Sequence, residues 1–277
     1  MRRTKKRRNI IIAWLVLAVS ICAMVFYGFK LRDTRRVYQV GEESYQALTD
    51  LARPGGLPVF KDPQIGTGPS GNSAGSQAGP QPDKQAKVAI PDMEIDFDVL
   101  HSINPDIVAW LYCPDTVIDY PIVRATEYDY YLHHLPDGTV NANGTLFIDY
   151  NWKGFSDRLT VVYGHNMKSG RMFGSISNYK KQDYFNAHPY MYLYTEEGER
   201  FRIDLKYGCV IAAGQWRDRA FMFDVNLDSL LAFAEYNTTF QSDTQISDSD
   251  RIITLTTCSY EFNDARYIVV GVLRPEY

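Results

Sequence analysis

The chain has 277 residues, of which 45% are hydrophobic, and a formal net charge of −4. This length suffices for one sizeable domain and excludes an array of three. Residues 1–36 carry a net charge of +9, so the rest of the chain carries −13. That acidic balance argues against binding to nucleic acid and against tight adhesion to an anionic membrane surface.

The N-terminal region has the pattern of a membrane anchor. Ile10 to Phe29 is a run of 20 residues without a charge, long enough to cross a bilayer as a helix. Six Lys and Arg residues lie in the predicted cytoplasmic tail, residues 1–9, and the positive-inside rule therefore places the remainder of the chain outside the cell. A cleaved signal peptide is the alternative. It is disfavoured because the run exceeds the usual length of about 7–15 residues and Lys30-Leu31-Arg32 follows it.

Two segments separate the predicted span, residues 10–29, from the predicted folded domain. Residues 30–52 contain helix formers of mixed charge and indicate a short juxtamembrane helix. Residues 53–87 are dominated by Gly, Pro, Ser and Gln, and lack the apolar residues that would offset the entropy lost on ordering. They predict a disordered tether, with the folded domain over residues 88–277.

The folded domain is expected to be mainly β. Apolar runs bounded by turn signals predict eight strands: residues 108–112, 116–123, 145–150, 159–163, 190–194, 200–213, 251–255 and 267–273. Asn143-Gly144 marks a tight turn before the third strand, and residues 196–199 join the fifth to the sixth. Helices are predicted over residues 96–103 and 227–236. Eight strands with few peripheral helices indicate a closed or nearly closed β-barrel.

Three cysteines lie outside the apolar span. They are Cys113, Cys209 and Cys258, and an odd number at irregular spacing is not a disulfide framework. A Cys113–Cys209 bridge remains an alternative to the favoured interpretation, in which both thiols pack in the core. The adjacent His133 and His134 would point to opposite faces of a strand, so no metal and no cofactor are predicted.

One cleft is expected to collect a thiol, a guanidinium and an imidazole. The strand over residues 251–255 leads to Cys258, and the next strand begins just after Arg266, so both groups flank one connecting loop. His165 follows the strand over residues 159–163. Taken singly, each has a simpler explanation as a core thiol, a surface arginine paired with a carboxylate, or a strand-end histidine.

In combination, these motifs resemble the sortases, the cysteine transpeptidases that fix proteins to the Gram-positive cell wall. The resemblance covers roughly residues 95–273. Thr254-Leu255-Thr256-Thr257-Cys258 is similar to the family's Thr-Leu-x-Thr-Cys signature, Arg266 stands where the family has its essential arginine, and His165 matches the catalytic histidine. Residues 104–111, 118–123 and 144–149 are most similar to class B. The resemblance implies a sortase-like eight-stranded barrel with His165, Cys258 and Arg266 as its catalytic residues.

The resemblance also implies an activity and its partners. Cys258 would attack the carbonyl after Thr in an Asn-Pro-x-Thr-like sorting signal near the C-terminus of a secreted protein. The acyl-enzyme would then pass to an amine of the peptidoglycan cross-bridge, at the outer face of the cell membrane. Three alternatives stay open: a membrane-bound cysteine endopeptidase, a pilus-polymerising sortase, and a non-enzymatic wall-binding module.

Each of the three residues has a role that its chemistry permits. An amide does not react with a neutral thiol, so Cys258 must become a thiolate and His165 can protonate the leaving amine. Arg266 stays protonated and cannot be the base, but it can bind carbonyl oxygens and the oxyanion. The sequence does not identify a group that orients His165. Asp264 is a candidate, whereas Asn166 is adjacent to the histidine and is expected to point elsewhere.

Overall fold

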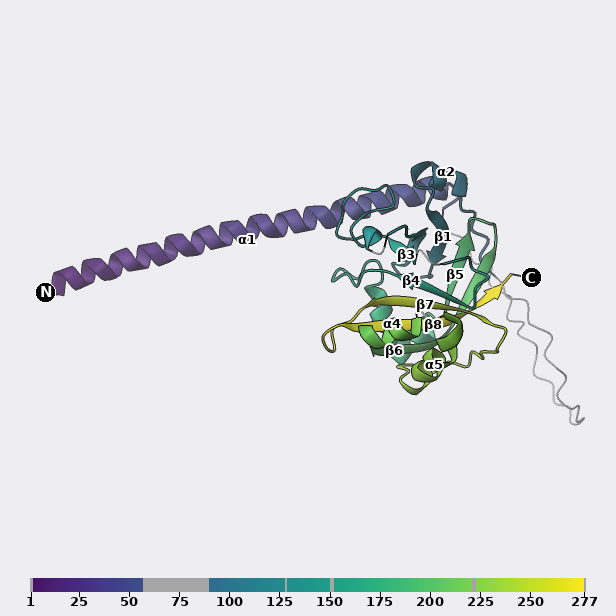
Figure 1. Ribbon diagram of the computed structural model, residues 1–277. Helices are drawn as coiled ribbons and strands as arrows, with labels where there is room; N and C mark the ends of the chain where they lie inside the picture. Colours follow the sequence, from purple (N-terminus) through teal and green to yellow (C-terminus); the bar gives the residue numbers. More distant parts are fainter. Residues whose placement is uncertain (1, 57–89, 128, 150–151, 221–222, 277) are drawn as a thin grey trace, which may run out of the picture.

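The computed structural model describes residues 2–56, 90–127, 129–149, 152–220 and 223–276. A single long helix, α1 (Arg2–Ala52), leads to a β-barrel with short helices on its outside (Figure 1). The predicted mainly-β architecture is therefore confirmed.

Eight strands close the barrel in the order β1-β2-β3-β4-β7-β8-β6-β5. Their bounds are β1 (Ile107–Tyr112), β2 (Asp119–Arg124), β3 (Leu146–Ile148), β4 (Leu159–Tyr163), β5 (Tyr190–Thr195), β6 (Arg200–Ala212), β7 (Arg251–Cys258) and β8 (Ala265–Pro275). The pairs β2–β3 and β4–β7 are parallel, and the other pairs are antiparallel. Parallel neighbours need long connections, and the segments that follow β2, β4 and β6 are the long ones and carry groups of the site.

The helices agree with the sequence in part. Helices α2 (Phe97–Ile103) and α5 (Phe223–Tyr236) lie where helices were predicted, and the side chain of Asp96 caps α2 by accepting from the Val99 amide at 3.0 Å. The pattern of apolar residues in the sequence did not predict four short elements: α3 (Gln182–Ala187), α4 (Ala213–Ala220) and the 3₁₀ turns η1 (Tyr130–Leu132) and η2 (Ser175–Lys180). These four are too short to show a helical period.

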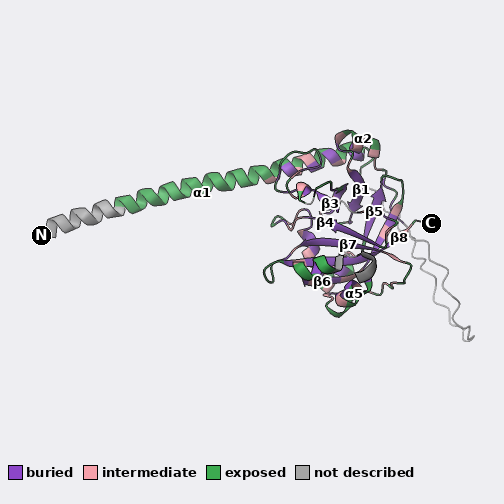
Figure 2. Ribbon diagram, in the orientation of Figure 1, coloured by how far each residue is buried: buried purple, intermediate pink, exposed green. Residues whose placement is uncertain are grey.

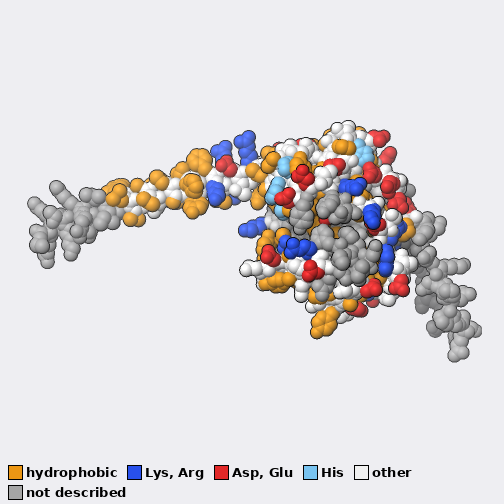
Figure 3. Space-filling model, viewed as in Figure 1, with side chains coloured by type: hydrophobic (Ala, Val, Ile, Leu, Met, Phe, Trp, Pro, Cys, Tyr) orange, Lys and Arg blue, Asp and Glu red, His pale blue; other side chains and the backbone are white. Residues whose placement is uncertain are grey.

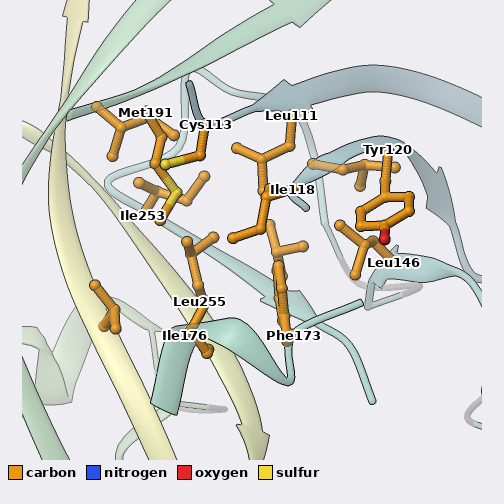
Figure 4. Close-up of a cluster of buried hydrophobic side chains, with 14 of the residues drawn as sticks. Leu111, Cys113, Ile118, Tyr120, Leu146, Phe173, Ile176, Met191, Ile253 and Leu255 are labelled. Atoms are coloured by element: carbon orange, nitrogen blue, oxygen red, sulfur yellow. The ribbon is translucent and has the colours of Figure 1, made fainter. Parts of the chain in front are cut away.

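Alternating residues of β7 divide the packing into an inner and an outer layer. Ile253 and Leu255 point into the barrel interior, where they meet Leu111, Ile118 and Phe173 (Figure 4). The alternate residues of β7 face outwards. Among them, Ile252 lies in another apolar cluster with residues of α4, α5 and β8, called here the outer cluster. Because side chains alternate along a strand, Cys258 belongs to this outer row.

The C-terminal turns of α1 are part of the folded domain. Tyr45, Leu48 and Ala52 are buried against the barrel, and Figure 2 shows the helix change from exposed to buried where it reaches the strands. Arg53, 6% exposed, forms an ion pair with Asp119 at 2.6 Å. The expected domain bounds, residues 88–277, do not include this packed segment.

The apolar part of α1 is continuous with its docked end. Among the described residues, α1 is the one helix long and apolar enough to cross a membrane. The large apolar side chains of its apolar run are exposed (Figure 3). No break separates this run from the predicted juxtamembrane helix. Tyr38, which packs against the barrel, comes nine positions after Phe29, or about 14 Å further along the helix. Most of the predicted tether lies in residues 57–89, outside the described residues.

Candidate active site

Strand pairing brings the three predicted site residues together. Cys258 is the last residue of β7, and Arg266 is its direct partner in antiparallel β8. Strand β4 runs parallel to β7, and beyond it the amide of Gly164 donates to the carbonyl of Thr256 at 3.1 Å. The hydroxyl of Thr257 donates to the Gly164 carbonyl at 2.7 Å, so the next residue, His165, lies beside the end of β7.

One cavity of about 350 Å³ is lined by all three residues. Its wall is largely apolar, because α4 covers one side of it with the buried ring of Trp216, and Leu132 and Phe147 lie on another side. The remaining lining residues are Ala125, Asp149, Tyr163, Gly164, Ala213, Arg217, Thr256, Thr257 and Asp264. A cleft of this kind can hold an extended peptide beside the thiol and shield the reacting bond from water.

The imidazole of His165 is held by a backbone group. Its Nε2 lies 2.7 Å from the carbonyl oxygen of Leu132. A carbonyl only accepts, so Nε2 carries hydrogen and Nδ1 is the nitrogen left for proton exchange. The sequence offered Asp264 for this orienting role, but the ring's recorded hydrogen bond goes to Leu132. No residue-type pattern marks a backbone carbonyl, which is why the sequence did not reveal it.

Asn166 has a part in the site that the sequence did not assign. Its Nδ2 donates to the carbonyl of Cys258 at 2.7 Å. The segment that carries His165 is thus tied directly to the residue that carries the thiol. Asn166 does not bond the imidazole, in line with the expectation that its side chain points elsewhere, but its hydrogen bond to the Cys258 backbone was not predicted.

Arg266 keeps most of its donors free for other partners. Its Nη1 donates to the carbonyl of Ala265 at 3.0 Å. The sequence alternative was a surface ion pair with Glu261 or Asp264, yet Glu261 pairs with Lys180 and accepts from Ser259. In the described part of the chain Arg266 has no ion pair with a carboxylate. A guanidinium has five N–H donors, so several remain for oxygens in the cavity.

The other cysteines are buried and unpaired. Cys113 lies in the barrel interior and Cys209 in the outer cluster, so a bridge between them is excluded and both are free thiols. Burial raises the pKa of the Cys113 thiol to about 11 and that of Cys209 to about 12. Cys258 is partly exposed and lines the cavity, where a thiol is accessible to a ligand.

Thiol labelling should therefore single out Cys258. In a Cys22→Ala background, a charged methanethiosulfonate at pH 8 is expected to modify Cys258 within minutes. Cys113 and Cys209 should react only in urea. Their raised pKa values keep both thiols protonated at pH 8 in the folded protein, and only the thiolate reacts. Mass spectrometry of digests gives the site. Labelling of either buried thiol in the folded protein as fast as Cys258 would contradict this assignment.

His133 and His134 lie elsewhere than on a strand. They follow η1, where the ring of His134 stacks on that of Tyr130 at 3.8 Å and its Nδ1 lies 2.7 Å from the Tyr130 carbonyl. The strand geometry assumed for this pair was wrong. The described residues contain no group of three His, Cys, Asp or Glu side chains that could hold a metal ion.

A family model of the sortase domain matches residues 111–274. The chain belongs to the sortase family. Sortase B of Listeria monocytogenes serovar 1/2a is 32% identical over 183 residues, which cover 63% of this chain and 72% of that protein. Sortase B of Staphylococcus aureus is 26% identical over 179 residues, covering 63% and 73%.

Solved structures agree in fold. Clostridium perfringens sortase B has a TM-score of 0.60 at 32% identity, and the match covers 65% of this chain and all of that one. A Streptococcus pyogenes class B sortase involved in pilus biogenesis has a TM-score of 0.58 at 27% identity, covering 64% of this chain and 97% of the other. This sortase is therefore a cysteine transpeptidase of the class B type, as its motifs predicted.

Proposed function

We propose that this sortase cleaves an Asn-Pro-x-Thr-like sorting signal through a thioester on Cys258 and transfers the protein to a peptidoglycan amine. The observation that carries the proposal is the arrangement of Cys258, His165 and Arg266 around one largely apolar cavity. Each of the three lies at or just beyond the end of a different strand, and strand pairing together with the Thr257 hydroxyl bond to Gly164 holds these strand ends side by side.

The proposed acylation needs Cys258 as a thiolate and His165 as an imidazolium. The thiolate of Cys258 adds to the carbonyl carbon after Thr, and the C–N bond breaks as the tetrahedral intermediate collapses. The departing nitrogen takes a proton from Nδ1 of imidazolium His165, which leaves the Nε2–H bound to Leu132. An acceptor amine then gives a proton back to Nδ1 as it attacks the thioester and releases the thiolate.

Arg266 supports the same steps without exchanging a proton. Its guanidinium is always charged and presents donors in a planar fork, which suits a carbonyl oxygen that becomes an oxyanion. The proposal is supported by its place opposite Cys258 in the β7–β8 register, which would bring the charge near the reacting carbonyl. We assign it oxyanion stabilisation together with binding of the substrate backbone.

Arg266→Lys separates these two roles. Lysine keeps the charge but loses the fork, so we expect the rate of acylation to fall by about 10²-fold with a smaller change in substrate affinity. Arg266→Ala should be worse still. Rapid-quench measurement of acylation at several peptide concentrations gives both constants. A loss confined to KM would leave Arg266 as a substrate-binding residue only, and wild-type values in both constants would remove it from the site.

The proposed location is the outer face of the cell membrane, with the N-terminus in the cytoplasm. It is supported by the apolar helix, by the basic residues before it and by the continuity of α1 with the barrel. The short distance between the apolar run and the docked end would hold the cavity close to the membrane. Secreted proteins still attached by a C-terminal apolar segment would present their signal at such a height.

Product analysis tests the transfer step. With a peptide containing Asn-Pro-Ala-Thr-Gly and an added oligoglycine or diaminopimelate-type amine, we expect the amide to the added amine as the main product. Free acid as the sole product at saturating amine would instead show an endopeptidase. Because the similar S. pyogenes sortase is involved in pilus biogenesis, a lysine side chain of a pilin-type peptide is the second acceptor to test. Preference for that peptide over both amines would favour a polymerase.

A further inference from the structure

The group that orients His165 belongs to a loop between β2 and β3. This loop, residues 130–145, begins with η1 and ends at β3, and its Leu132 carbonyl accepts from the imidazole. This bond to Leu132 is the only hydrogen bond made by a ring nitrogen of His165 within the described part of the chain. The position of the imidazole therefore depends on what holds the loop.

Within the loop, Gly144 lies directly against the Leu132 carbonyl. Its φ is +59°, and a Cβ at this position would lie 2.7 Å from the carbonyl oxygens of both Tyr131 and Leu132. The next residue, Thr145, donates its amide to Tyr131 at 2.8 Å and its hydroxyl to the carbonyl of His134 at 2.8 Å. A shift of Gly144 or Thr145 would thus be transmitted to the carbonyl that binds His165.

The docked end of α1 holds this part of the loop. The hydroxyl of Tyr45, which is 6% exposed, donates to the Gly144 carbonyl at 2.5 Å and also lies 3.3 Å from Thr145 Oγ1. Asn141 donates its side-chain amide to the carbonyl of Val37 at 3.0 Å. Gly41 is in such close contact that an added Cβ would lie 2.2 Å from Nδ2 of Asn143.

We propose that the docked end of α1, residues 37–52, is a positioning element for the catalytic histidine. Tyr45 fixes Gly144 and Thr145, these fix the Leu132 carbonyl, and that carbonyl fixes the imidazole. The proposal rests on the proposed role of His165. Because the same helix carries the apolar run, the anchor and the positioning element are one continuous structure.

Tyr45→Phe in the full-length protein in nanodiscs is the first test. It removes the hydroxyl and keeps the ring, so we expect kcat on the Asn-Pro-Ala-Thr-Gly peptide to fall by about fivefold, with KM changed by less than about twofold. Tyr194→Phe is the matched control, because this buried hydroxyl also donates to a backbone carbonyl, that of Pro91 at 2.8 Å, on the β5 side of the barrel. It should lower the melting temperature to a similar extent and leave kcat within about twofold of wild type.

A glycine pair on α1 gives a second test. Gly41→Ala and Gly28→Ala both raise helix propensity, but only the first places a methyl group against the loop, since nothing lies within 4 Å of a Cβ at Gly28. We expect Gly41→Ala to lower kcat and Gly28→Ala to leave it unchanged. Equal activity of the two variants would contradict a positioning role for the contact.

The ring of His165 supplies a readout that needs no substrate. Nitrogen NMR of the five histidines in the wild-type protein should show His165 as a single Nε2–H tautomer, and Tyr45→Phe and Gly41→Ala should give averaged tautomers, unlike their controls. An unchanged His165 signal in both variants would overturn the proposal. A changed signal with full activity of His165→Ala would support the positioning contact and contradict the proposed function instead.

Discussion

Cys258→Ala is expected to abolish both cleavage and transfer, with residual turnover below about 1% of wild type. In the proposed mechanism the sulfur of Cys258 is the atom that bonds to the substrate, and neither Cys113 nor Cys209 could replace it, because both are buried in separate clusters. The fold should be unaffected, since Cys258 is partly exposed and its backbone pairing with Arg266 does not depend on the side chain.

Cys209→Ala is the matched control for this variant. It removes a thiol from the outer cluster below α5, so it should lower the melting temperature while keeping activity within about twofold of wild type. Peptide cleavage by Cys258→Ala above the 1% level, with its melting temperature unchanged, would exclude this residue as the nucleophile.

His165→Ala should be nearly as severe, with a loss of about 10²–10⁴-fold in kcat/KM. No other imidazole is placed to protonate the leaving amine, since in the described structure His165 is the one histidine that lines the cavity. Added imidazole should restore part of the activity because it can enter the space left by the ring and carry the same proton.

A second histidine provides the control. His101 also bonds a backbone carbonyl through Nε2, that of Ile107 at 2.8 Å, but on the α2 side of the barrel. His101→Ala should keep nearly full activity and show no effect of added imidazole. Wild-type rates from His165→Ala without imidazole would remove the histidine from the proton-transfer role.

The barrel was predictable because its strands carry the signal in their own residues. The run Ile252-Ile253-Thr254-Leu255 is β-branched and apolar, and such runs pack only where both faces are covered. The short helix α4 carried no such signal. Its polar sequence is held mainly by the burial of Trp216 in the outer cluster, which is a tertiary contact that no local period reveals.

The docking of α1 was missed although a signal existed. Tyr45, Leu48 and Ala52 recur at spacings of three and four, which is the apolar stripe of a helix that packs on a core. The surrounding charges and the polar segment that follows hid this stripe. The Leu132 carbonyl and the Asn166 amide were beyond the reach of pattern analysis, because their roles depend on where β3, β4 and β7 meet.

This docking also changes how the anchor relates to the site. A flexible segment between membrane and barrel would leave the cavity free to move, whereas α1 runs without a break from the apolar run to residues packed against the barrel. The height and orientation of the cavity above the membrane would then be set by the helix. The same contacts reach the loop that holds His165.

The most direct test of the mechanism is to isolate the covalent intermediate. The full-length protein would be incubated with the Asn-Pro-Ala-Thr-Gly peptide without an added amine, quenched in acid, digested with pepsin and analysed by mass spectrometry. We predict an acyl group ending in Thr on the fragment that contains Cys258, and its loss on treatment with hydroxylamine. Continued peptide cleavage with no adduct on Cys258, or with the adduct on another residue, would contradict the thioester mechanism.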